Sequence, residues 1–232
     1  RPGRAVLHAF IRYSTPVVCN EALWSTGTSM LTVIMGHMGN SQDMLAAYAL
    51  IGNIDRVATV VCFGIAASAA VIVGKEIGQG RDRQRVYEVS WTLLLVSMLV
   101  GAVVTVLELA LLPTLFRPVL FPLFKLTPGA AAVAGYLTVI YVVFMPMRAF
   151  DITNITGVLR AGGDGKVASL IDILPLWLVA IPLMAVTGLV LDAPTWLVCV
   201  AMQAENICKC PIGLVRFHSK RWINDITRAA ES

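Results

Sequence analysis

The stretch "TPVVCNEALWSTGTSMLTVIMGHMG" (residues 15–39) has the length and apolar character of a membrane-spanning helix, yet it contains an acidic residue, Glu21. About 20 consecutive apolar residues are enough for a helix to cross the hydrocarbon core of a bilayer. A charged side chain at the centre of such a helix costs about 3 kcal/mol, so acids within spans usually face a protein interior or a wet cavity. The stretch therefore predicts a membrane helix with one face turned away from lipid.

The composition of the whole chain also indicates an integral membrane protein. Charged residues make up 14% of the 232 residues and hydrophobic residues 57%, and the mean hydropathy is +0.77. Soluble domains average about 25% charged residues. The net charge of +4 is better explained by membrane topology than by a nucleic-acid surface, because the basic residues fall in a few segments between apolar stretches.

Turns and charged segments divide the apolar sequence into six predicted spans. These lie near residues 15–37, 45–74, 88–112, 130–152, 167–190 and 194–215, with a lead-in at 1–14 and a basic tail at 216–232. The second span is longer than a perpendicular helix needs, so we expect it to tilt or to begin outside the bilayer. The predicted fold is an all-α bundle of six transmembrane helices. The run "FGIAASAA" (63–70) of the second span, with Gly64 and Ser68 four residues apart on one face, predicts a surface for close helix packing.

The distribution of Lys and Arg predicts the orientation of this bundle. Two of the 18 basic residues, Arg117 and Lys125, fall on one side of the predicted membrane, and Arg56 and Arg148 fall within spans. The other fourteen fall on the opposite side, in residues 1–12, 75–85, 160–166 and 209–228. Cytoplasmic loops carry an excess of Lys and Arg. We therefore expect both ends of the segment to be cytoplasmic.

The first span contains a polar stripe. At 100° per residue, Ser25, Thr28 and Thr32 lie within about 40° of Glu21. This arrangement predicts that the stripe lines a cavity. The alternative is that Glu21 only forms hydrogen bonds with a Ser or Thr of a neighbouring helix.

The fourth span ends in a second polar group, within "PMRAFDITNITGVLRAGGDGK" (residues 146–166). Arg148, Asp151 and Asn154 follow one another at three-residue steps on one broad face. Glu21 lies nine residues after Arg12, and Asp151 nine residues before Arg160. If both arginines mark the same membrane boundary, the two acids lie at a similar depth, about 13 Å in. They could then share one cavity and bind a proton or cation together.

Alternative interpretations remain for these polar residues. Asp151 could be neutralised by Arg148 in a structural ion pair at i−3. We expect Asp55 and Asp172 to be interfacial, and Asp55 not to pair with its neighbour Arg56. Glu205 and Lys209 are spaced i,i+4 in the favourable order and predict an ion pair near the inner face.

The sequence carries no motif of a known catalytic or metal centre. G-x-S-x-G, H-E-x-x-H and the Walker pattern are absent, and the three histidines lie at the ends of the predicted spans or in loops. Cys208 and Cys210 are separated by one residue and have no His or Cys pair nearby, so we expect small packed side chains there rather than a metal site. We expect no enzyme and no cofactor. Pro146 removes a backbone hydrogen bond within the fourth span and Pro175 within the fifth, which predicts hinges there.

Four stretches together are similar to the carboxyl-terminal half of bacterial MATE (multidrug and toxic compound extrusion) transporters. They are residues 15–51, "GKEIGQG" (74–80), the segment 146–166 with its "GVLRAGGD" block, and "AENICKCPIGLVRFHSKRWINDIT" (204–227). The resemblance implies that this chain corresponds to helices seven to twelve of a twelve-helix transporter with two six-helix lobes. It also implies export of organic, often cationic and amphipathic, compounds in exchange for sodium ions or protons, across the bacterial inner membrane.

The resemblance also implies a coupling site. Some branches of the family place an ion-binding acid on helix seven and another on helix ten, for which Glu21 and Asp151 are the candidates here. The expected position on helix ten is two residues earlier, where this sequence has Ala149. Arg148, Asn154, Ser25, Thr28 and Thr32 would complete the ion and substrate cavity.

Other branches place the coupling site in the amino-terminal lobe, which would be the missing partner of this chain. A half-size transporter that dimerises is a less favoured interpretation. The alternative functions are a lipid-linked oligosaccharide flippase of the same superfamily, a membrane-embedded enzyme and a structural membrane subunit. A flippase cavity should be more cationic, an enzyme needs a nucleophile and base or metal ligands within the spans, and a structural subunit needs no polar stripe.

Overall fold

The computed structural model describes residues 4–224, and it describes side chains for residue 15 and residues 17–224. The predicted lead-in (1–14), with Arg1, Arg4 and Arg12, and the end of the tail, with Arg228, therefore lie outside the described side chains. All regular elements of the described chain are helical. In order they are α1 (Arg4–Gly36), α2 (Ser41–Gly78), α3 (Arg83–Leu111), η1 (Leu112–Leu120), α4 (Phe121–Leu123), α5 (Pro128–Ile152), η2 (Thr153–Leu159), α6 (Gly165–Pro175), η3 (Leu176–Ala180), α7 (Ile181–Ala185), η4 (Val186–Val190), α8 (Thr195–Met202) and α9 (Ala204–His218).

The η segments are π-helical and join the α-helices into longer rods. Within residues 4–224, five rods are long and apolar enough to cross a membrane. They coincide with the second to sixth predicted spans: Ser41–Gly78, Arg83–Leu123, Pro128–Leu159, Gly165–Val190 and Thr195–His218. The first predicted span lies within α1 but is not one of these five, and its polar stripe makes it less apolar than the others.

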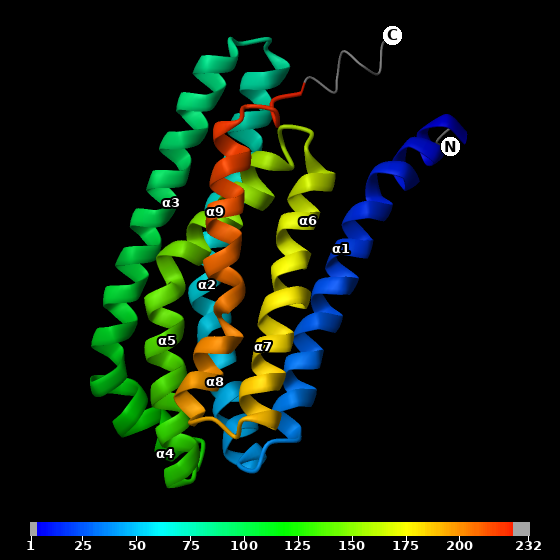
Figure 1. Ribbon diagram of the computed structural model, residues 1–232. Helices are drawn as coiled ribbons and strands as arrows, with labels where there is room; N and C mark the ends of the chain where they lie inside the picture. The colour runs from blue at the N-terminus through cyan, green and yellow to red at the C-terminus, as the bar shows by residue number, and fades with distance from the viewer. Residues whose placement is uncertain (1–3, 225–232) are drawn as a thin grey trace.

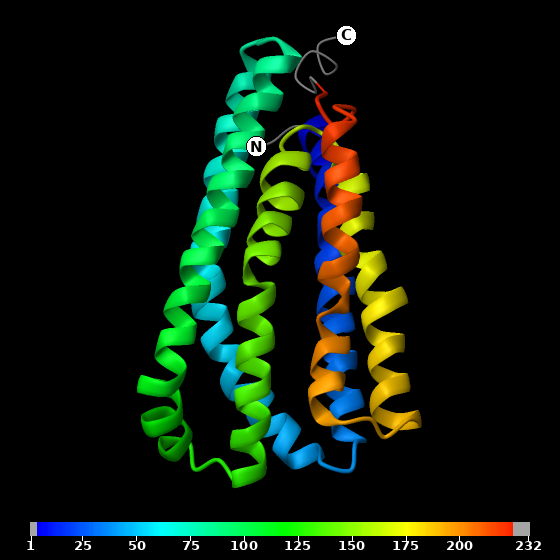
Figure 2. The same ribbon diagram turned by 60° about the vertical axis from the view of Figure 1, so that its left-hand side comes forward.

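The rods stand side by side as a bundle (Figure 1). The beginning of α1, the α2–α3 turn, the turn after η2 and the end of α9 lie at one end, and α4 and the α1–α2 connection at the other (Figure 1). The basic segments 75–85, 160–166 and 216–221 therefore lie toward one end, and Arg117 and Lys125 toward the other. This separation agrees with the predicted segregation of charge. Figure 2 shows α2 crossing the bundle obliquely, which explains how a helix of 38 residues fits beside shorter ones.

Local signals account for where the helices begin. The Asp82 side chain accepts a hydrogen bond from the backbone N–H of Gln84 at 3.2 Å, which caps α3. The Thr127 hydroxyl accepts one from the N–H of Ala130 at 3.0 Å, and Pro128 occupies the first position of α5. These are preferred residues for an N-cap and for the first helical position.

Small residues bring α2, α3 and α5 into close contact. A Cβ on Gly101 of α3 would lie 2.9 Å from the Cα of Pro146. The Ser97 hydroxyl donates to the carbonyl of Ala149 at 2.7 Å and lies 2.6 Å from the Thr153 hydroxyl. Such contacts hold helices together in lipid, where the hydrophobic effect provides little attraction between them.

The run "FGIAASAA" (63–70) packs closely as predicted, but through residues other than Gly64 and Ser68. Gly64 and Ser68 are exposed, and a Cβ on Gly64 would meet nothing within 4 Å. The contact is made instead by Ala66 and Ala69, because a Cβ on Gly157 of η2 would lie 2.7 Å from the Ala66 carbonyl oxygen. Both faces of "FGIAASAA" carry small residues, so spacing alone did not distinguish them.

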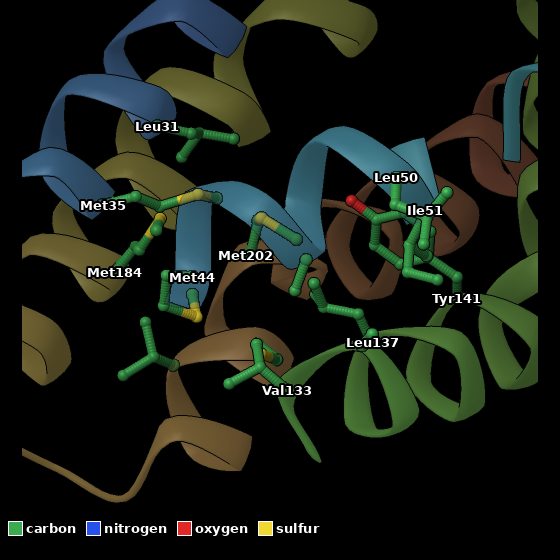
Figure 3. Close-up of a cluster of buried hydrophobic side chains, with 14 of the residues drawn as sticks. Leu31, Met35, Met44, Leu50, Ile51, Val133, Leu137, Tyr141, Met184 and Met202 are labelled. Carbon is green, nitrogen blue, oxygen red and sulfur yellow. The ribbon is translucent and has the colours of Figure 1, made fainter. Parts of the chain in front are cut away.

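Two buried clusters fill the bundle. The cluster shown in Figure 3 joins α1, α2, α5, α7 and α8 through residues that include Met35, Met44, Leu137, Met184 and Met202. The second cluster lies around Phe217 and Trp222, both fully buried, with Tyr87 stacked on Phe217 at a centroid distance of 4.9 Å.

The cluster around Trp222 explains part of the "GVLRAGGD" block. Gly162 packs against Trp222 so closely that a Cβ there would lie 2.5 Å from the Trp222 carbonyl oxygen. Gly163 has φ 83°, a conformation that favours glycine. The Asp164 carboxylate accepts a hydrogen bond from Arg216 Nε at 2.6 Å. The block is therefore a turn on which the segment after α9 is seated.

Candidate functional site

A polar cavity of about 750 Å³ lies between α1, α2, α5–η2, α6 and α9. Its walls carry five acids and four cations together with aromatic and hydroxyl groups. The charged lining residues are Glu21, Asp55, Asp151, Asp172, Glu205, Arg56, Arg148, Arg160 and Lys209. We call it the central cavity.

The polar stripe of the first predicted span lines the central cavity. Glu21, Ser25, Thr28 and Thr32 are all among its lining residues. The Thr28 and Thr32 hydroxyls donate to backbone carbonyls one turn earlier, so their oxygens keep acceptor capacity toward the cavity. The Glu21 side chain is 60% exposed.

Asp151 and Asn154 form the most buried polar group of the cavity wall. Asp151 is 3% exposed and Asn154 is fully buried. Within the described part of the chain, both carboxylate oxygens of Asp151 and both amide atoms of Asn154 lack a hydrogen-bond partner. Gly213 of α9 leaves the space for Asn154, because a Cβ there would lie 2.8 Å from Asn154 Nδ2. A buried ionised carboxylate without a partner is strongly unfavourable, so this pocket favours a proton or a small cation.

Arg148 pairs with Asp55 and not with Asp151. Its guanidinium donates two hydrogen bonds to the Asp55 carboxylate, the second from Nη2 to Oδ2 at 2.8 Å. It also lies over the ring of Tyr141, 5.6 Å from the centroid. The predicted alternative, in which Arg148 neutralises Asp151 along one helix, is therefore wrong. Asp55 is likewise no isolated interfacial acid, because its side chain is only 13% exposed and joins α2 to α5.

Asp172 is the centre of a second charge network. Its carboxylate accepts hydrogen bonds from Asn20 Nδ2 at 3.2 Å and from Lys209 Nζ at 3.1 Å. Lys209 also pairs with Glu205 at 3.0 Å, as the i,i+4 spacing predicted. Asp172 therefore ties α1 and α9 to α6, which its position in one helix did not indicate.

Glu21 and Asp151 line the same cavity without forming a pair. Glu21 lies 3.5 Å from the guanidinium of Arg160, which also lies 3.8 Å from Asp172. Arg160 is therefore part of the cavity wall.

The two predicted hinge prolines occupy different settings. Pro146 lies inside the continuous helix α5, seven residues before η2 begins at Thr153. Pro175 is the last residue of α6, and η3 begins directly after it. Short π-helical segments within α-helices are frequently found at functional sites. Hinge motion at either proline remains a prediction.

Sequence reasoning did not place Asp55, Asp172, Asn20 or Lys209 in the site. A usable signal was present, because an acid and a base buried in different spans need partners. Their pairing could not be read from one helix at a time. Within the described residues, no group of three or more His, Cys, Asp or Glu side chains is placed to hold a metal ion.

Comparison with known proteins identifies the family. The model of the MatE family matches residues 16–186. This chain belongs to the MatE family. It is 26% identical over 166 residues to the uncharacterized transporter YisQ of Bacillus subtilis (strain 168), a match that spans 71% of this chain and 35% of YisQ.

Solved MATE structures share the fold. An outward-facing multidrug resistance MATE transporter superposes with a TM-score of 0.75 at 20% identity, covering 94% of this chain and 46% of that one. An inward-facing structure of a multidrug resistance MATE transporter superposes with a TM-score of 0.77 at 14% identity, covering 95% of this chain and 50% of that one. A MOP superfamily transporter from Pyrococcus furiosus superposes with a TM-score of 0.76 at 20% identity, covering 94% of this chain and 46% of that one. This chain thus spans about half the length of these MatE relatives, or less, and it is a multi-pass membrane protein.

Proposed function

We propose that this MatE chain is the carboxyl-terminal lobe of an exporter of amphipathic organic cations, driven by exchange for sodium ions or protons. The observation that carries the proposal is the buried pair Asp151 and Asn154, whose polar side-chain atoms have no hydrogen-bond partner within residues 4–224. The proposal is for transport rather than catalysis.

The energetics of this pocket support ion coupling. A buried neutral polar group that has no hydrogen-bond partner costs about 1–3 kcal/mol, and a buried charged group without a partner costs more. A proton on Asp151, or a sodium ion shared between the Asp151 carboxylate and the Asn154 amide oxygen, removes that cost. An exchangeable ligand of this kind is what coupling requires.

The lining of the central cavity supports a cationic amphipathic substrate. Trp24, Tyr48, Phe63 and Tyr141 provide aromatic surface beside the acids, and aromatic rings bind organic cations through their faces. A substrate cation near Asp151 would compete electrostatically with the coupling ion. Mutual exclusion of the two gives antiport.

Glu21 is proposed as the acid at the open part of the cavity. It is exposed and paired with Arg160, so it can exchange its partner for an arriving cation at little cost. Ser25, Thr28 and Thr32 then provide hydroxyl oxygens along the wall toward the buried pocket.

The charge balance of the cavity is less favourable for the flippase alternative. A pyrophosphate would need several unpaired cations. Arg148, Arg160 and Lys209 each have an acidic partner within the described chain, whereas Arg56 is the lining cation for which no ion pair is found there. A single unpaired cation would bind a pyrophosphate only weakly.

Alternating access requires a second body, and we propose that this body is an amino-terminal lobe of the same transporter. The two lobes would rock around the central cavity, with bending at Pro146 and Pro175. The excess of Lys and Arg at one end supports a cytoplasmic location of that end in a bacterial inner membrane.

The test is uptake of ethidium, a fluorescent organic cation, into everted vesicles that contain the full-length transporter, under an imposed sodium or proton gradient. We expect gradient-driven uptake in the wild type, its loss in Asp151→Asn and a weaker effect in Glu21→Gln, at matched protein levels. Uptake that is the same without a gradient would contradict antiport. Uptake that persists in Asp151→Asn would move the coupling site out of this lobe.

A further inference from the structure

A second cavity of about 810 Å³ lies between the η1–α4 segment and the beginning of α5. Its lining includes Phe121, Leu126, Ala132, Tyr136 and Val139, and among the described residues that line it, Arg117 is the charged one. We call it the Arg117 groove. It lies at the end of the bundle where α4 is found, away from the turn that contains "GVLRAGGD" (Figure 1).

The Arg117 groove opens on the outer surface of the lobe. At 100° per residue, Ala132, Tyr136 and Val139 lie about 140–180° around α5 from Tyr141, which faces the central cavity. Tyr136 is 48% exposed and Val139 is 42% exposed. Exposed apolar side chains on the outside of a membrane lobe meet acyl chains. The groove is therefore separate from the substrate path.

Arg117 lies in this groove without a protein partner. Its guanidinium rests against α5, with Nη2 3.7 Å from the position that a Cβ on Gly135 would occupy. No ion pair or hydrogen bond joins its side chain to another residue in the described part of the chain. Arg117 is exposed near the end of its rod, so its guanidinium is accessible to a negatively charged group that enters the groove.

The beginning of α5 lines the groove beside Arg117. Leu126 and Ala131 lie on either side of the first turn of this 25-residue helix. The N–H groups of this turn are not part of the proposed site, because Thr127 caps Ala130 and the Asp43 carboxylate lies against Gly129. The groove therefore combines one guanidinium with a long apolar wall.

We propose that the Arg117 groove binds an anionic phospholipid of the surrounding membrane. The phosphodiester would contact Arg117, and one acyl chain would lie along Ala132, Tyr136 and Val139. The volume suits a headgroup with part of a chain, since ligand cavities of about 300–1,000 Å³ hold molecules of that size. The apolar wall favours a lipid over free phosphate, and the cation favours an anionic lipid over a zwitterionic one. The proposal does not rest on the identity of the transported substrate.

The experiment is thermal unfolding of the purified full-length transporter in detergent, with added phosphatidylglycerol, phosphatidylcholine or inorganic phosphate. A ligand that binds only the folded state raises the Tm. We expect phosphatidylglycerol to raise it by about 5 °C, and the other two to leave it unchanged. The shift should vanish in Arg117→Gln and be partly kept in Arg117→Lys. Lys125→Gln, which removes the other basic residue at this end, should respond as the wild type does.

A second variant tests the groove independently of its charge. Ala132→Trp fills the apolar wall at an exposed position and should also abolish the response to phosphatidylglycerol while leaving the Tm without lipid unchanged. A shift that persists in both Arg117→Gln and Ala132→Trp would overturn the proposal. An equal shift with phosphatidylcholine, or with inorganic phosphate alone, would overturn it in favour of nonspecific lipid or of a free-phosphate site.

Discussion

Breaking the Arg148–Asp55 pair should destabilise the lobe strongly. The two side chains are 18% and 13% exposed, and their bidentate contact joins α5 to α2. Removing one partner of a buried ion pair costs about 3–5 kcal/mol, because the other charge is left without compensation. Both residues also line the central cavity, where water reduces that penalty. We therefore expect about 3 kcal/mol for either Arg148→Met or Asp55→Asn.

Thermal unfolding of the purified transporter measures this effect. For 150–250 residues, about 1 kcal/mol shifts the Tm by roughly 2–4 °C, so each variant should lower it by about 6–12 °C. The double variant should recover most of the loss, because it leaves no unpaired charge. Arg56→Gln is the matched control, since Arg56 neighbours Asp55 and is exposed, and it should change little. The reasoning would be refuted if the Tm losses of the two single variants simply added in the double variant, or if either equalled the loss in Arg56→Gln.

Two further variants test the packing and the second charge network. Gly162→Ala should lower the Tm by several degrees, because its Cβ would lie 2.5 Å from the Trp222 carbonyl oxygen. Gly165→Ala is the control, since a Cβ there meets nothing within 4 Å. Equal Tm values for the two variants would contradict the packing of the segment after α9 on this turn. Lys209→Met should also lower the Tm, since it removes the cation that lies 3.0 Å from Glu205 and 3.1 Å from Asp172, and of these two acids only Asp172 keeps another cation, Arg160. The exposed Lys166→Met should be neutral in the same unfolding assay, and a neutral Lys209→Met would show that the network adds nothing to stability.

Much of the fold could be predicted from hydropathy and charge. Each of the five long apolar rods overlaps one predicted span, because a bilayer sets a minimum length for an apolar helix and satisfies none of its backbone groups. Glu21, Ser25, Thr28 and Thr32 line one cavity because residues at such spacing share one helix face. The Glu205–Lys209 pair was predictable for the same reason.

Contacts between helices could not be predicted in this way. Arg148 and Asp55 are 93 positions apart, and neither residue carries a local sign of its partner. The side chain of Arg160 reaches into the cavity toward Glu21 and Asp172, and its position at the end of the fourth predicted span did not indicate these partners. Periodicity assigns a residue to a face of its own helix, but the neighbour of that face depends on the tertiary packing of the whole lobe.

The most direct test of ion coupling at Asp151 is the release of ions when a substrate binds. Ethidium would be added to the purified full-length transporter in weakly buffered solution, with proton release followed by a pH indicator and bound sodium by a radioactive tracer. The account predicts that ethidium displaces protons or sodium ions from the wild type and from Glu21→Gln, and displaces neither from Asp151→Asn. Undiminished displacement from a folded Asp151→Asn variant would contradict it.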